Sequence, residues 1–325
     1  MTESPGYVPP PRTDPPPATS PIYAPPAYPP AAPVQYAPAG AYRISGGLRA
    51  TIAAVIAIVA LLAGLSVYTI AGVAVAASRI STADRALYTA IAHHDDLSKT
   101  LDTLGGQLQS VIGDNYDPMQ ARRLMAQFVT TSKSAGGTVD GDDAALASAG
   151  SKLNDHQWLT VFSRGRLDHE ADRISHARKA LENARILTSD YVLVGQFFQA
   201  YAEVVIDYVT LIGSYQDQDY TGASTADASL RTHVDQALSQ SGAPGLPAVM
   251  HDFLVDFKVL AVDIGKLIDA VKGRDQAAFD AALTKVKADN AKLDSYDFSL
   301  TGAQLRAYYQ PLRDKFDAEM DKATR

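Results

Sequence analysis

The sequence predicts an all-α protein in which a single transmembrane helix joins a disordered, proline-rich N-terminal tail to a bundle of long antiparallel helices. Three observations predict this class. Fourteen of the 18 prolines precede residue 40, 29 uncharged residues separate Arg49 from Arg79, and apolar residues recur at helical spacing from Arg79 onward. We therefore assign residues 1–47 to the tail, 48–78 to the transmembrane helix and 79–325 to an extracytoplasmic helical bundle.

The tail is rich in proline, alanine and tyrosine. Because proline lacks the amide proton and fixes φ, residues 1–42 are expected to form a disordered, partly polyproline II chain. Pro25–Tyr28 matches the PPxY ligand of WW domains, and Pro26 and Pro29 form a PxxP motif. Such matches arise readily by chance here, so a spacer or tether is the simpler interpretation and a docking site for a protein partner is the alternative.

In composition this tail resembles the Pro/Ala/Tyr-rich cytoplasmic tails of actinobacterial single-pass membrane proteins. The resemblance covers the first 42 of 325 residues and brings no catalytic motif with it. It implies a cytoplasmic tail and disfavours WW domains as partners, because those domains are largely eukaryotic. The tyrosines of the tail are Tyr7, Tyr23, Tyr28, Tyr36 and Tyr42.

The uncharged segment at residues 50–78 is predicted to be a permanent membrane anchor. Its 29 residues span roughly 43 Å as a helix, whereas the hydrocarbon core needs only about 20 residues. The apolar region of a signal peptide has only about 7 to 15 residues. Ala74–Ala76 does match a signal-peptidase site, so a cleaved signal peptide is the alternative.

The charges that flank the anchor do not decide its orientation. Arg43 and Arg49 precede it and Arg79 and Arg85 follow it, so the positive-inside rule favours neither side. We expect a cytoplasmic N-terminus, because such anchors commonly translocate a long C-terminal part, and therefore a single-pass protein of the plasma membrane. No second span is expected, since the next apolar run, Tyr191–Ala202, has only 12 uncharged residues.

Small residues recur four apart in the anchor, a spacing that lets two helices approach closely and makes a homodimer possible. An alanine-rich segment also produces this spacing by composition alone, which is the simpler interpretation. The pairs are Ala53 and Ala57, Ala60 and Gly64, and Gly72 and Ala76.

Turn signals divide the region after the anchor into helices. Asn115–Pro118 is expected to be a turn, with Pro118 at the first position of the next helix. Thr138–Asp142 is expected to be a loop before another helix, and the longest periodic segment then runs from about Asp155 to Gln216. The apolar stripe before the first turn consists of Leu97, Leu101, Leu104, Leu108 and Val111.

Three further helices are predicted after Pro244 and Pro247. Asp275 is the expected N-cap of the second, and Pro311 is expected to kink the third near its start. Their stripes are Val249, Phe253, Phe257, Leu260, Ile264, Leu267 and Val271; then Phe279, Leu283, Val286 and Leu293; then Leu305, Tyr309, Leu312, Phe316 and Met320.

The long helix contains the most specific pattern of the domain, a run of residues spaced alternately by four and three. This seam needs a facing helix, and we expect it to be the one striped by Phe253, Leu260 and Leu267. Three of its members are tyrosines, whose buried hydroxyls need partners, so a polar groove or self-association surface is the alternative. The seam is Leu187, Tyr191, Val194, Phe198, Tyr201, Val205, Tyr208, Ile212 and Tyr215.

Composition excludes several chemistries. Without cysteine the chain has no disulfide, thiolate metal site or cysteine nucleophile. The net charge of −7, and of −9 from Ile80 onward, argues against binding nucleic acid and against lying flat on anionic lipid. The sequence lacks GxSxG, P-loop and GxGxxG motifs, so no enzyme is expected. The single tryptophan, Trp158, is expected to pack in the core.

Candidate metal ligands occur on two helices. Three share one face of the long helix at i, i+3 and i+7, and three more lie close together nearer the anchor. The charges around the first set alternate in sign, which favours a solvated surface, and the Glu-x-x-His spacing of dinuclear sites is absent. The residues are His169, Asp172 and His176, and His93, His94 and Asp96.

Asp217–Gly222 imitates the start of an EF-hand loop, but the twelfth position is Ala228 where calcium requires a bidentate glutamate. A polar loop between helices is the better interpretation. We therefore predict no catalytic residue, no cofactor and no metal site.

Two functions from different classes remain. The first is a structural or partner-binding protein of the cell envelope, which contacts lipid through its anchor and unidentified proteins through its tail or bundle. The second is a sensory or ligand-binding module, which resembles the helical extracytoplasmic domains of bacterial receptors. A sensor with so short a cytoplasmic part would have to signal through a separate partner, so the first function is favoured.

Overall fold

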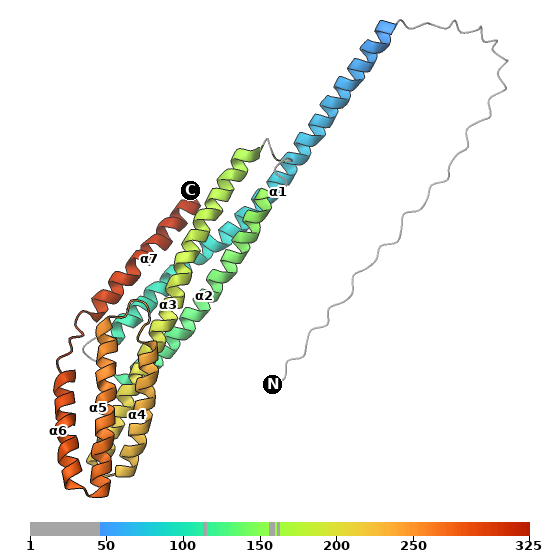
Figure 1. The fold of residues 1–325 in the computed structure, drawn as a ribbon. Coiled ribbons are helices and arrows are strands. Elements are labelled where there is room, and N and C mark those ends of the chain that lie inside the picture. The colour runs from blue at the N-terminus through green and yellow to red at the C-terminus, as the bar shows by residue number, and fades with distance from the viewer. Residues whose placement is uncertain (1–45, 113–115, 156–159, 161–162) are drawn as a thin grey trace, which may run out of the picture. The chain divides into compact units, whose positions relative to one another are not determined.

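The structure is a computed structural model that describes residues 46–325, except 113–115, 156–159 and 161–162, with side chains from residue 67 onward. In this part of the chain it contains helices and no strand, which confirms the all-α class (Figure 1). The helices are α1 (Gly46–Val111), α2 (Pro118–Asn154), α3 (Arg164–Gln216), α4 (Tyr220–Gln240), α5 (Ala248–Gly273), α6 (Gln276–Leu293) and α7 (Thr301–Thr324).

The predicted tail and most of the predicted transmembrane segment lie outside the residues whose side chains are described. The tail ends at residue 47, and residues 48–66 make up the greater part of the segment predicted at 48–78. Among the described residues, no helix has both the length and the apolar character needed to cross a membrane.

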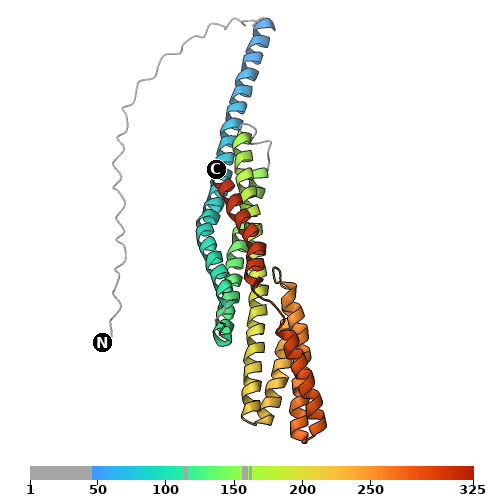
Figure 2. The same cartoon turned by 90° about the vertical axis from the view of Figure 1, so that its left-hand side faces the viewer.

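Helix α3 is the central element of the residues from 60 onward. It packs against α2 and α7, and also against α4, while α5 packs between α4 and α6. Figures 1 and 2 show α2, α7 and the start of α3 at the end of the bundle where α1 leaves it, and α4, α5 and α6 at the other end.

Several predicted boundaries are confirmed. Pro118 begins α2, and the side chain of Asp117 caps that helix by accepting the amide protons of Met119 and Gln120. Asp275 caps α6 in the same way, because it accepts the amide proton of Ala278. The predicted first stripe, from Leu97 to Val111, is buried in the core.

Other boundaries were wrong. Residues 138–142 form no loop, because α2 continues through them to Asn154 with Val139 and Asp142 buried on its inner face. The long helix begins at Arg164 and not near residue 155. Helix α4 was not assigned from sequence; three of its six buried positions are alanines, which give a weak apolar stripe. Helix α7 runs from Thr301 to Thr324 with Pro311 inside it.

The α3 seam has its partners within the chain. Its first four members, from Leu187 to Phe198, are buried, and those from Tyr201 onward are half-buried. The predicted facing helix, α5, contributes rings at two places: Phe253 lies 6.4 Å from Tyr201 and Phe257 lies 5.5 Å from Tyr208, between ring centroids. The backbone closest to this half of α3 is nevertheless that of α4, so the prediction was correct only in part.

Candidate functional site

The structure does not bring the candidate metal ligands together. Three of the four candidate histidines each pair instead with a carboxylate of another helix. His169 and Asp172 are exposed on α3. No three histidine or acidic side chains in the described part of the chain are placed to share an ion. The pairs are His93 of α1 with Asp142 of α2 at 2.9 Å, His94 of α1 with Asp317 of α7 at 3.1 Å, and His176 of α3 with Glu319 of α7 at 2.7 Å.

The EF-hand-like segment forms a helix cap. Asp219 is the N-cap of α4, and its carboxylate accepts the amide proton of Gly222 at 2.9 Å. Ala228 then lies inside α4, two turns further on. Asp219 therefore starts α4, and Asp217 is the C-cap of α3. The segment is a polar connection between two helices, as predicted from the sequence.

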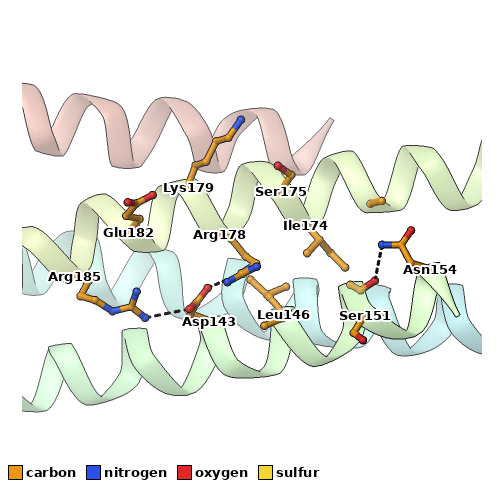
Figure 3. A pocket seen from close by; sticks show the side chains of 13 residues that line it. Asp143, Leu146, Ser151, Asn154, Ile174, Ser175, Arg178, Lys179, Glu182 and Arg185 are labelled. Carbon is orange, nitrogen blue, oxygen red and sulfur yellow. Dashed lines mark hydrogen bonds and ion pairs between the residues drawn. The ribbon is translucent and has the colours of Figure 1, made fainter.

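A groove of about 640 Å³ lies between the second half of α2 and the first half of α3 (Figure 3). Its floor contains Leu146, Gly150 and Ile174. The two helices approach closely there, because a β-carbon at Gly150 would lie 3.5 Å from Ile174 Cγ2. The lining also contains five charged side chains, beside small and polar ones: Asp143, Arg178, Lys179, Glu182 and Arg185.

Two arginines of α3 converge on one carboxylate of α2 in this groove, as Figure 3 shows. Arg178 Nε donates to Asp143 at 2.8 Å, and Arg185 donates to Asp143 at 3.1 Å and to Asp140 at 2.7 Å. Burial opposes the charge of Asp143, but the hydrogen bonds from the two guanidinium groups outweigh it and lower the pKa of this carboxyl.

These ion pairs both join the helices and leave cationic surface in the groove. The side chains of Arg178 and Arg185 keep 47% and 43% of their surface exposed, so both remain accessible to an anionic or hydrogen-bonding partner. The lining also contains Ser151, Ser175 and Lys179. The exposed guanidinium groups suit the groove to binding an anionic group.

Charged groups also join the C-terminal helix, α7, to α1 and α3. Arg313 pairs with Asp102 of α1 at 2.6 Å, and Arg173 of α3 donates to the carbonyl of Ala323 at 2.9 Å. Hydrogen bonds from His176 and from Lys322 lower the pKa of Glu319 to about 2. Periodicity in the sequence reveals the apolar stripe of α7, but it does not show which carboxylates meet which histidines.

At the end of the bundle where α1 leaves it, apolar side chains are exposed. Val67, Ile70 and Val73 are 68%, 70% and 52% exposed, whereas Gly72 and Ala76 on another face of α1 are buried. The predicted small-residue pair Gly72 and Ala76 is therefore covered by the chain itself and is not free for a second copy. The other two pairs lie outside the residues whose side chains are described.

No protein-family profile, curated protein or solved structure matches this chain. Function is therefore inferred from the residues described above.

Proposed function

We propose that the protein is a single-pass, membrane-anchored helical bundle of the cell envelope that binds a protein partner and is not an enzyme. The supporting observation is the exposure of Val67, Ile70 and Val73, which directly follow the uncharged sequence at residues 50–66. Contiguous exposed apolar surface commonly marks contact with a membrane or a partner. Because this surface continues an apolar sequence, a bilayer is the partner we favour.

Because Gly72 and Ala76 are buried, we infer that the segment in hydrocarbon is shorter than the predicted residues 48–78. Residues that pack against the protein's own chain do not face lipid, so we place the membrane boundary near Ile70. Residues 50–70 then form a helix of about 31 Å, which matches the roughly 30 Å of a bilayer core. The tail lies on the cytoplasmic side in this proposal, and the bundle lies outside.

Partner binding is assigned to the α2–α3 groove and to the tail. The groove presents half-exposed Arg178 and Arg185, and the tail offers polyproline sequence that a partner domain can recognise. Neither feature requires a cofactor.

Alkaline carbonate extraction of membranes from cells that make the full chain tests the anchor. We expect the protein to stay in the membrane pellet. The double variant Leu61→Arg and Leu62→Arg should be released, because a charged side chain is costly within the bilayer. Tyr88→Arg, at an exposed position of α1 outside the segment, is the matched control and should stay in the pellet. Release of the unaltered protein would contradict the proposal.

A second candidate is an extracytoplasmic sensory or ligand-binding module, and the cationic groove favours it. A thermal-shift screen of small anionic molecules on the full chain separates the two functions. A stabilising ligand whose effect disappears in Arg178→Gln with Arg185→Gln would favour the sensory module. Stabilisation that persists in this variant would place the ligand elsewhere.

A further inference from the structure

Three helices carry basic side chains at the end of the bundle where α1 leaves it. We call this group the basic collar. Both views show the end of α2 and the start of α3 beside α1 (Figures 1 and 2). The guanidinium of Arg79 also donates to the carbonyl of Asp155, which fixes α1 to the end of α2. The collar consists of Arg79 of α1, Lys152 of α2, and Arg164 and Arg166 of α3.

The charge of this end is opposite to that of the rest of the domain. Residues 67–79 and 152–168 contain four basic and two acidic residues, a net charge of +2, whereas the chain from Ile80 onward sums to −9. At the other end, residues 217–222 and 269–280 contain five acidic and two basic residues. The positive charge is therefore concentrated beside the exposed apolar surface of α1.

Three of the four collar side chains are available for an external anion. Lys152, Arg164 and Arg166 are exposed. Arg164 makes one distant pair, at 3.8 Å, with Asp168, and both of these side chains are more than two-thirds exposed, so the pair is weak. Within the described residues, no ion pair engages Lys152 or Arg166.

We propose that the basic collar binds the phosphate headgroups of anionic lipids and so holds this end of the bundle against the bilayer surface. The proposal rests on the membrane anchor proposed above. The hydrocarbon boundary proposed near Ile70 lies nine residues, or about 14 Å of helix, before Arg79, and long arginine and lysine side chains extend toward headgroups from this end of the bundle. Each basic side chain near an anionic surface changes the equilibrium constant for contact by about fivefold.

Energy transfer between tryptophan and labelled lipid tests this contact in the full chain. Trp158, which was expected to pack in the core, lies outside the described residues, three positions after Asp155 in the sequence. It is the only tryptophan, so it serves as a single donor to dansyl-labelled headgroups. The protein is reconstituted in phosphatidylcholine vesicles with or without phosphatidylglycerol, at low and high salt. We expect transfer to rise with phosphatidylglycerol and to fall again at high salt.

A matched pair of triple variants assigns the effect to the collar. Lys152→Gln with Arg164→Gln and Arg166→Gln should remove the dependence on phosphatidylglycerol. The control changes three exposed lysines at the other end of the bundle, Lys272, Lys285 and Lys287, to glutamine, and it should keep the full dependence. Circular dichroism should show the same helix content in both variants.

Flotation with neutral vesicles at high salt separates the two proposals. A chain that does not float contradicts the anchor, and the collar proposal falls with it. A chain that floats but shows the same transfer with and without phosphatidylglycerol overturns the collar alone. Dependence on phosphatidylglycerol that persists in the collar variant overturns it as well.

Discussion

Gly195 of α3 faces the ring of Phe128 of α2 so closely that no larger residue fits there without a shift. A β-carbon at residue 195 would lie 2.6 Å from Cδ1 of Phe128 and 2.7 Å from Cγ2 of Val129. Phe128 is fully buried, and its ring also lies 5.5 Å from that of Tyr191, between centroids. The glycine thus allows a close approach of α2 and α3, the two helices that enclose the groove.

Gly195→Ala should therefore destabilise the domain. The overpacking costs about 1 to 3 kcal/mol, while alanine recovers at most about 1 kcal/mol of helix propensity. Gly137 of α2 is the matched control, because nothing lies within 4 Å of a β-carbon built there. Gly137→Ala should raise the melting temperature while Gly195→Ala lowers it. A rise for both would show that α2 and α3 are not in close contact at Gly195.

Helix α2 also shows where local sequence misleads. Residues 138–142 carry threonine, glycine and two aspartates, which are typical of turns. The helix persists because Val139 and Asp142 face inward, where Asp142 meets His93 of α1. Asp140 also pairs with Arg185 of α3. These tertiary contacts outweigh local propensity, and no local pattern reveals them.

The seam of α3 gives a second test of stability. Phe198 is 3% exposed, so Phe198→Ala should cost about 3 to 5 kcal/mol in the free energy of unfolding. Tyr208 is only half-buried, so Tyr208→Phe should cost on the order of 1 kcal/mol or less. Thermal and urea unfolding measure both. A Phe198→Ala variant that melts like the parent but loses binding or self-association would make the seam an interface.

Acid should weaken the attachment of α7. Hydrogen bonds from His176 and Lys322 depress the pKa of Glu319 from 4.5 to about 2, so its contribution to stability is present above pH 4.5 and is lost as the pH falls towards 2. Glu319→Gln should lower the melting temperature by about 2 to 4 °C at most at pH 6, because the pair is near the surface. The difference from the parent should vanish near pH 2.

Glu182→Gln, an exposed change on α3, is the control for this measurement and should show no such pH dependence. A Glu319→Gln effect that stays constant from pH 6 to pH 2 would contradict the role of the carboxylate charge.

Chelation should leave the fold unchanged. His93, His94 and His176 each pair with a carboxylate of another helix, and the core stripes form one apolar cluster. Circular dichroism of the full chain in detergent should give the same helix content and melting temperature with and without EDTA. A large loss of helix on chelation would restore the candidate ligand set on α3.

The candidate sites were less predictable than the fold, for a physical reason. Helical periodicity identifies inward-facing residues such as Leu187 and Phe198, because it depends only on local spacing. Arg178 and Arg185 reach Asp143 only because of the register between α2 and α3. Each arginine is 35 to 42 positions away from that aspartate in the sequence. That register follows from close contacts such as Gly195 with Phe128, which a single sequence does not reveal.

The intact mass of the membrane-extracted protein tests the central claim, a retained membrane anchor, most directly. If residues 50–70 stay in the bilayer, the mass should correspond to a chain that still contains the tail and the whole uncharged segment. A soluble product whose N-terminus is Ala77, after cleavage behind Ala74–Ala76, would contradict the account and make the bundle a secreted protein.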